Sequence, residues 1–359
     1  MTQIRSVKTL IIGGGLSGLA LANLLEAKGH DYFLVEARDR FGGRIKTESV
    51  DRGYFDVGPA WFWDGQPRMA RLVTHLDLAV FEQHADGILM HEDESGQVHR
   101  SRGFASMQGS YRVLGGLAGL TDGLAHRLPD LRKQTNAPVT SLLKDGHKIV
   151  ATLASGVQVQ ADNVVLALPP RLAAQIAYTP ALADQTRQAM QNVPTWMAGQ
   201  AKAVAVYDTP FWREQGLSGD ASSRFGPMVE VHDASPAQGG PFALFGFIGV
   251  PPQGRREAAA LRTQLLAQLG RLFGPQAAAP MQLIVKDWAR DLFTATQADQ
   301  APLYAHPTYH LPSAMTGLWE GRLHFAGTEV APQFGGYLEG ALEAADTAFA
   351  ALTTGGRPR

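Results

Sequence analysis

Gly13, Gly15 and Gly18 directly follow an apolar run that ends at Ile12, and Glu36 ends the next apolar run along the chain. In this spacing the first glycine makes a tight turn, the second lets the backbone approach a pyrophosphate, and the third lets a helix pack closely on the strand. The helix N-terminus then offers N–H groups and the positive end of its dipole to the phosphates. Glu36 is placed to accept hydrogen bonds from ribose hydroxyls. The pattern predicts a dinucleotide site and leaves NAD and FAD both open.

Two arginines follow Glu36 in a short stretch that also contains Gly42 and Gly43. Arg38 and Arg44 come soon after the turn that we expect at the pyrophosphate. Arginine suits this place because its guanidinium is always charged and binds phosphate oxygens through paired hydrogen bonds. A single arginine is more often a solvated surface charge, but the spacing from Glu36 favours phosphate contacts for both.

These N-terminal residues resemble the FAD-binding unit of the flavin amine oxidases, a family that includes monoamine and polyamine oxidases. A second match lies near the C-terminus, where Gly327-Thr328-Glu329 and the run 335–341 look like the family's Gly-Thr-Glu and Gly-Tyr-Met-Glu-Gly-Ala pair, with Leu338 in place of methionine. The strand 163–168 is also similar. The resemblance implies FAD as the cofactor. The chain has no cysteine, which excludes a cysteinyl link, so we expect non-covalent binding.

The C-terminal motif has physical properties that fit this resemblance. Gly335 and Gly336 permit a close approach of the backbone, and a helix is predicted to begin near Tyr337. The positive end of its dipole would stabilise the negative charge of a reduced flavin. The resemblance implies that Glu329 meets the ribityl chain and that Tyr337 flanks the substrate in front of the flavin.

Lys202 is the one charged residue in the apolar run 201–207. A lysine there either points to solvent or is buried at a substantial cost. In the family, a lysine at the matching place holds a water beside the hydride-accepting nitrogen of the flavin. A buried cation there would also help dioxygen to accept electrons. The resemblance implies a catalytic centre of Lys202, Tyr337 and Trp288, with Trp288 bordering the flavin.

Trp61 and Trp63 follow the loop that in the family crosses the flavin, and we expect them to shape the pocket, with Gly58 close to the cofactor. Many members carry a second aromatic residue a little beyond the position of Trp288. The corresponding stretch here, 294–299, contains neither tyrosine nor phenylalanine. The resemblance therefore predicts an amine substrate but an incomplete aromatic wall in front of the flavin.

The motifs and the segments beside them give the full set of residues that we expect to contact the cofactor. These are Gly13, Gly15, Leu16, Ser17, Gly18, Glu36, Ala37, Arg38, Gly43, Arg44, Gly58, Pro59, Ala60, Val139, Gly327, Glu329, Gly336, Tyr337 and Leu338.

The elements that position these residues fall into two groups. Residues 1–60, 137–170 and 322–359 have strand, glycine-turn and helix patterns that predict one discontinuous Rossmann-like FAD-binding domain. Residues 61–136 and 171–321 mix amphipathic helices with strands such as 201–207, 242–249 and 282–288. They predict a mixed α+β substrate-binding domain. The fold class is therefore α/β, with the active site between the two domains.

Composition excludes several other classes of protein. The chain has 359 residues, a net charge of −1 and 45% hydrophobic residues, which suits two ordinary globular domains. No long basic run suggests a nucleic-acid partner, and no apolar run is long enough to predict a membrane span. The eleven histidines have no spacing typical of a metal site. Because no signal-peptide pattern is seen at the start, we expect a cytoplasmic protein.

We therefore expect an FAD-dependent oxidoreductase that oxidises a small amine to an imine, with hydride transfer to the flavin and reoxidation by dioxygen to hydrogen peroxide. Two alternatives stay open. One is a renalase-like or desaturase-like flavoenzyme that acts on a dihydronicotinamide or on a C–C bond. The other is a non-catalytic protein that binds FAD for structure.

Overall fold

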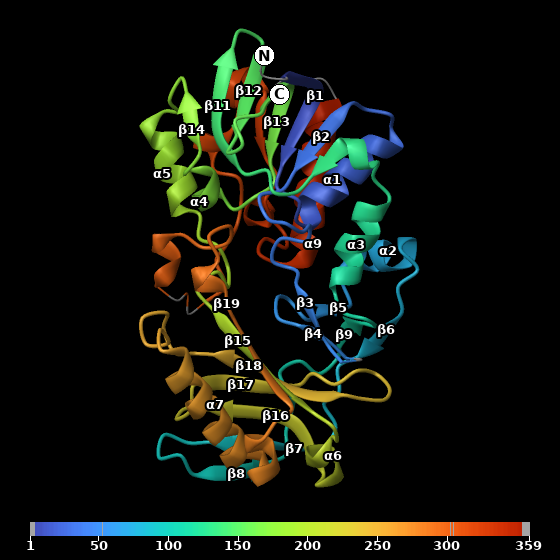
Figure 1. Ribbon diagram of the computed structural model, residues 1–359, viewed down its shortest axis with the longest axis vertical. Coiled ribbons are helices and arrows are strands. Elements are labelled where there is room, and N and C mark those ends of the chain that lie inside the picture. The colour runs from blue at the N-terminus through green and yellow to red at the C-terminus, as the bar shows by residue number, and fades with distance from the viewer. Residues whose placement is uncertain (1–3, 52, 302, 304, 354–359) are drawn as a thin grey trace.

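The computed structural model describes residues 4–51, 53–301, 303 and 305–353. Two large sheets lie at opposite ends of the molecule (Figure 1). The first sheet has eight strands in the order β10-β2-β1-β13-β12-β11-β14, and β20 pairs with β13 beside this path. Its strands are β1 (Ile4–Ile12), β2 (Tyr32–Val35), β10 (Lys133–Gln134), β11 (Val139–Asp145), β12 (Lys148–Leu153), β13 (Gln158–Leu166), β14 (Ala177–Thr179) and β20 (Leu323–Phe325).

The strand β13 explains how one sheet is both parallel and antiparallel. Along one edge it pairs in parallel with β1 over its whole length. On the other edge its first half pairs with β12 in an antiparallel manner, and Val164–Leu166 pair in parallel with β20. The strand that we predicted at 163–168 is the second part of this longer strand, which begins at Gln158 and ends at Leu166. The strand stays continuous because both of its halves have a neighbouring strand on each side.

Helices cover the first sheet and bring distant segments together. The helix α1 (Leu16–Ala27) packs against α9 (Leu338–Thr353) and α3 (Ala118–His126), and α9 also packs against α2 (Pro67–His75). Leu19, Leu72, Leu120 and Leu342 share one apolar core. The short helix α4 (Pro170–Ala173) packs against α5 (Asp184–Asn192), and α8 (Leu318–Gly321) precedes β20.

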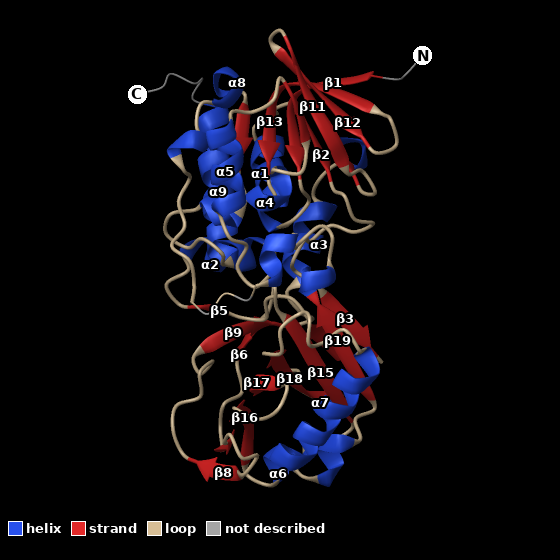
Figure 2. Cartoon of the chain, turned by 90° about the vertical axis from the view of Figure 1, so that its left-hand side faces the viewer, coloured by secondary structure: helices blue, strands red, loops and turns tan. Residues whose placement is uncertain are grey.

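The second sheet has seven strands in the order β19-β15-β18-β17-β16-β7-β8. These are β7 (Ile88–Glu92), β8 (Val98–Ser101), β15 (Ala201–Tyr207), β16 (Leu217–Ser223), β17 (Met228–Asp233), β18 (Phe242–Ile248) and β19 (Gln282–Asp287). The long helix α7 (Ala258–Phe273) and the short α6 (Phe211–Glu214) cover one face, as Figure 2 shows. Every residue of β15, which lies between β19 and β18, is buried.

Two small sheets lie between the large ones (Figures 1 and 2). One pairs β3 (Thr47–Val50) with β4 (Gly53–Asp56), and the other has the order β5-β9-β6. The strands of the latter are β5 (Phe62–Trp63), β6 (Val80–Glu82) and β9 (Ser110–Val113). Short 3₁₀ helices span Asp130–Arg132, Pro275–Ala278, Trp288–Arg290, Gln297–Gln300, Ser313–Met315 and Thr328–Val330.

The α/β class with a Rossmann-like unit and a mixed second unit is confirmed. The packing refines the division of the chain that we predicted. The helices α2 and α3 come from 61–136, which we assigned to the substrate-binding domain, yet they share a core with α1 and α9. Likewise β14, beyond our boundary at residue 170, joins the first sheet through β11. We therefore propose that the FAD-binding domain includes α2, α3 and β14. None of the helices in the described ranges has the length and apolar character needed to cross a membrane.

Candidate active site

A cavity of about 580 Å³ lies between the two large sheets. One end is formed by the turn between β1 and α1, and the other by residues of β15, β18 and the loop after β19. All but two of the residues that we predicted to act in catalysis or cofactor binding line it. Gly18 and Glu329 do not line the cavity. Residues from distant parts of the chain therefore share one space.

The turn between β1 and α1 has no room for side chains at two of its glycines. Gly13 has a φ of +114°, and a Cβ there would lie 2.4 Å from the carbonyl oxygen of Ala167. A Cβ on Gly18 would lie 1.9 Å from the carbonyl oxygen of Gly13. Gly18 therefore lets α1 pack on β1 and acts behind the cavity wall. Gly15 lines the cavity and is the N-cap of α1. Among the described residues, no side chain forms a capping hydrogen bond with this helix N-terminus.

Glu36 is buried, and both of its oxygens accept hydrogen bonds from the backbone. Oε2 accepts from the N–H of Gly14 at 2.7 Å, and Oε1 accepts from the N–H of Arg38 at 2.9 Å. The carboxylate therefore fixes the turn as well as lining the cavity. Each carboxylate oxygen has a second lone pair, so these bonds leave acceptors for the ribose hydroxyls that we predicted.

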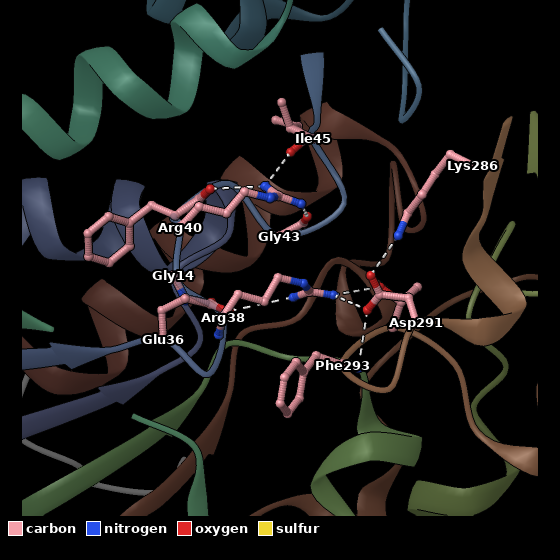
Figure 3. A network of polar contacts seen from close by, with 11 residues as sticks. Gly14, Glu36, Arg38, Arg40, Gly43, Ile45, Lys286, Asp291 and Phe293 are labelled. Carbon is pink, nitrogen blue, oxygen red and sulfur yellow. Dashed lines mark hydrogen bonds and ion pairs between the residues drawn. The ribbon is translucent and has the colours of Figure 1, made fainter. Parts of the chain in front are cut away.

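Arg38 lies at the cavity wall, but its guanidinium is engaged by residues near the other end of the chain. Nη2 lies 2.6 Å from Asp291 Oδ1, toward which it points in Figure 3, and 2.8 Å from Thr294 Oγ1. Nη1 lies 3.5 Å from Glu36. Arg38 thus bridges two carboxylates in this structure, an arrangement that our pyrophosphate prediction did not include. The spacing to Glu36 placed Arg38 at the cavity but carried no information about Asp291.

Arg44 and Glu329 form an ion pair with a separation of 2.6 Å, in which Glu329 is fully buried and Arg44 is partly exposed. Burial alone would lower the pKa of Arg44, but Glu329 raises it overall, so the guanidinium stays charged. Arg44 lines the cavity, whereas Glu329 has no exposed surface and lies behind it. We predicted that Glu329 contacts the ribityl chain. Its position behind the cavity does not favour such a contact. Glu329 instead orients the cation that faces the cavity.

The C-terminal motif forms a tight turn that leads into α9. Thr328 Oγ1 accepts from the N–H of Gly336 at 3.0 Å and donates to the carbonyl oxygen of Tyr337 at 2.8 Å. The helix begins at Leu338, as predicted. Gly336 has a φ of +84°, and a Cβ there would lie 2.9 Å from His306 Nε2. The glycine therefore keeps the turn close to the aromatic residues beside it, and Tyr337 and Leu338 line the cavity.

Lys202 is buried at the opposite end of the cavity, and its Nζ donates a hydrogen bond to the carbonyl oxygen of Gly58. Its ammonium lies 4.7 Å from the ring centre of Phe245 and 4.8 Å from that of Phe247. Burial lowers the pKa of Lys202 to about 7, although the charge of Asp56 acts in the opposite direction. Side chains alternate between the two faces of β15, and Ala203 and Ala205 pack with α7. Lys202 shares the other face with Val204 and Val206 and therefore points away from α7.

Trp288 lines the cavity next to Lys202 and is held by a hydrogen bond from Nε1 to the carbonyl oxygen of Val57 at 2.8 Å. The ammonium of Lys286 lies 4.4 Å from its ring centre. We predicted that the strand ends at Trp288; β19 ends one residue earlier, and Trp288 begins a 3₁₀ turn. Trp61 and Trp63 also line the cavity, as predicted.

Tyr337 has aromatic neighbours that the sequence motif did not reveal. His306 stacks on it with a centroid separation of 4.7 Å and an interplanar angle of 13°. Trp196 lies 5.0 Å from His306 and itself lines the cavity. Trp196 therefore adds an aromatic surface to the cavity, and the incomplete aromatic wall at 294–299 stays a prediction. Trp196 follows α5 and carries no motif, so its sequence position gave no signal.

Other lining residues were also missed. Phe247 sits opposite Lys202 in the register of β18 and β15 and could have been found only from the strand pairing. Leu292, Phe293 and Thr294 follow Trp288 in a loop without a recognisable pattern. Met197 and Gln200 precede β15.

Family models match most of the chain. A model described as flavin containing amine oxidoreductase matches residues 89–352, and one described as an NAD(P)-binding Rossmann-like domain matches residues 11–76. The two matches together include both the glycine turn and the C-terminal motif.

Individual proteins are similar along nearly their whole length. A protein of Dictyostelium discoideum named probable flavin-containing monoamine oxidase A is 23% identical, over 93% of this chain and 94% of its own. A structure of a putrescine oxidase variant has a TM-score of 0.83, with 21% identity over 98% of this chain and 100% of that chain. Cyclohexylamine oxidase from Brevibacterium oxydans has a TM-score of 0.79, with 22% identity over 96% of this chain and 98% of its own.

Proposed function

The chain belongs to the family of flavin-containing amine oxidoreductases, and from this premise we propose that it oxidises the C–N bond of a small amine with FAD as cofactor and dioxygen as electron acceptor. The observation that carries the proposal is the position of Lys202. A buried ammonium at one end of the cavity faces the same space as a dinucleotide-type turn at the other end.

The residues of the cavity fit FAD. The backbones of Gly15 and Gly43 lie close together, since a Cβ on Gly43 would lie only 3.1 Å from Gly15 Cα. This glycine pair leaves free the space beside the α1 N-terminus, where N–H groups favour phosphate. Arg44 adds a cation to the same wall, and Glu36 provides acceptors for a ribose. The far end is aromatic and apolar, as a flavin ring requires.

When bound, FAD supplies the acceptor for a hydride equivalent from the carbon next to nitrogen. A neutral primary amine that loses a hydride becomes an iminium ion, and water then releases the aldehyde and ammonia. Dioxygen takes up the two electrons and two protons and becomes hydrogen peroxide. The balance is one amine, one water and one dioxygen converted to one aldehyde, one ammonia and one peroxide.

The residues of this chain orient the reactants and exclude bulk water. Tyr337 and Trp196 provide aromatic surfaces near the start of α9, and Trp288 is fixed by its bond to Val57. Lys202 can hold a proton or a positive charge close to the reacting centre. Its pKa near 7 lets it do either at neutral pH. No side-chain base is required, provided that the amine reacts in its neutral form.

The test is product stoichiometry with a panel of amines. The protein loaded with FAD should consume dioxygen and form aldehyde, ammonia and peroxide in equal amounts with at least one amine. A parallel assay with dihydronicotinamides tests the renalase-like alternative. Turnover of a dihydronicotinamide in the absence of amine turnover would contradict the proposal. A protein that binds FAD but reacts with neither class would instead be a non-catalytic flavin binder.

A further inference from the structure

The segment 291–294 follows Trp288 and lies across the cofactor cavity from the glycine turn. Leu292, Phe293 and Thr294 all line the cavity. Leu292 is 81% exposed and Phe293 is 42% exposed, although both are large and apolar. A ligand in the cavity would cover these side chains, which gains free energy through burial of apolar surface.

Ionic and hydrogen bonds hold this segment against the N-terminal unit. Asp291 Oδ1 lies 2.6 Å from Arg38 Nη2 and accepts from the N–H of Phe293 at 3.2 Å. Asp291 Oδ2 lies 2.9 Å from the ammonium of Lys286. Thr294 Oγ1 adds a bond to Arg38 at 2.8 Å. Figure 3 shows Arg38 and Lys286 approaching Asp291 from different sides.

Burial makes this contact stronger than an ordinary surface ion pair. The side chains of Arg38 and Asp291 are 11% and 13% exposed. Burial on its own would raise the pKa of Asp291, but Arg38 and Lys286 lower it overall, so the carboxylate is charged at neutral pH. Screening by salt is weak for such a partly buried pair.

The strand register adds a reason for Asp291 to hold Lys286. Lys286 pairs directly with Lys202 across β19 and β15, so the two side chains leave the same face of the sheet. Like charges in this position repel each other. Asp291 draws the ammonium of Lys286 toward the segment, and Lys202 is left to the carbonyl oxygen of Gly58.

We propose that the segment 291–294 is a clasp over the adenosine half of FAD, with Asp291 as the positioning residue that fastens it to Arg38. The assignment to the adenosine half follows from Glu36, which is bonded to the N–H of Arg38 and lies beside the α1 turn. The glycine motif and the clasp both line the cavity, and Arg38 connects them. The inference rests on FAD binding, which is part of the proposed function.

The test is the rate of FAD release from the loaded protein, followed by flavin fluorescence after dilution with an excess of a competing apoflavoprotein. Asp291→Asn should release FAD at least about tenfold faster than the wild type, because loss of one partner of a partly buried charge pair acts mainly on dissociation.

Asp299→Asn is the matched control. Asp299 lies a few residues farther along the chain, forms an ion pair with Arg171 at 2.5 Å and does not line the cavity. The substitution breaks this ion pair. Release at the wild-type rate in Asp291→Asn would overturn the clasp. Equally accelerated release in both variants would also overturn it, since general loosening of the region would then be the cause.

Leu292→Ser keeps the proposal testable if Asp291→Asn fails to fold, because an exposed side chain is not needed for folding. This variant should release FAD a few times faster with an unchanged melting temperature of the apoprotein. An unchanged release rate contradicts the clasp. If the protein holds FAD but no amine reduces the flavin, the proposed function is contradicted. The comparison of FAD release rates would still test the clasp.

Discussion

At the level of single residues, Lys202 shows how a fully buried strand can supply a reactive group. Its neighbours in β15 are buried apolar residues, and its ammonium has one carbonyl acceptor, from Gly58, surrounded by aromatic rings. Such a site disfavours the charged form, which is why its pKa falls. The buried ammonium therefore costs stability.

The cost of Lys202 gives a pH-dependent prediction. Its pKa is about 7 in the folded protein and about 10.5 when unfolded, so the unfolded chain binds the proton more tightly between these values. The folded state is therefore destabilised progressively as pH falls from about 10.5 to about 7, and no further below that. Compared with the wild type, Lys202→Met should therefore be more stable at pH 6.5 than at pH 10 by about 4 kcal/mol of unfolding free energy.

Denaturant unfolding of the two apoproteins at a series of pH values measures this difference. Lys8→Met, which changes an exposed lysine, is the control and should show no such trend. A stability difference for Lys202→Met that does not vary with pH would mean that the ammonium is as well solvated as in water.

Lys202 also gives a kinetic prediction. A positive charge beside the reacting centre stabilises electron transfer to dioxygen, so Lys202→Met should slow reoxidation of the reduced flavin by at least about tenfold. Stopped-flow absorbance after mixing the reduced protein with oxygenated buffer gives this rate. The rate of reduction by amine in the same variant provides the comparison. Reoxidation at the wild-type rate would show that Lys202 has another role.

At the level of elements, the turn between β1 and α1 contains two kinds of glycine. Gly13 and Gly18 have no room for a side chain, whereas Gly15 leaves room for a ligand. A Cβ on Gly15 would meet nothing closer than Gly43 Cα at 3.8 Å, so alanine fits the protein. The same Cβ would occupy the wall beside the helix N-terminus. Gly15→Ala should therefore weaken FAD binding about tenfold or more, with little change in apoprotein stability.

Titration of the apoprotein with FAD, followed by fluorescence, measures this effect. Gly119→Ala in α3 is a matched control, because its Cβ would lie 3.4 Å from Leu78 and outside the cavity. Unchanged affinity in Gly15→Ala would mean that no phosphate approaches this turn.

Elements also mark the limit of what the sequence could predict. Gly13, Gly18 and Glu36 act through neighbours in one βαβ unit, so their spacing carried the information. Trp196, Phe247 and Leu292 reach the cavity through the pairing of strands and the course of loops, which depend on contacts between distant segments. For the same reason the sequence placed Arg38 at the site but did not predict its bond to Asp291.

At the scale of the whole molecule, one cavity between two sheets determines which amines fit. Glu36 is the one acidic residue among the described residues that line it, and it is bonded at the end beside the α1 turn. The end near Lys202 is lined by Trp61, Trp288 and Phe247. A second ammonium on a substrate would find no carboxylate there and would be repelled by a charged Lys202.

The protein should therefore prefer an apolar monoamine to a diamine. We expect kcat/KM for 2-phenylethylamine, an apolar amine that gives an aldehyde, to exceed that for putrescine by about 100-fold or more, because an unpaired buried charge costs at least about 3 kcal/mol. Initial rates of peroxide formation provide the comparison. A preference for putrescine would require an acidic group to reach the cavity by rearrangement of the two sheets.

The central claim is that an amine delivers electrons to a flavin held in this one cavity. The most direct test is the absorbance spectrum of the purified FAD-bound protein under anaerobic conditions during titration with the amine that it turns over fastest. The oxidised flavin bands should bleach completely with one equivalent of amine and return on admission of air. A colourless protein that takes up no FAD, or a flavin spectrum that no amine changes, would contradict it.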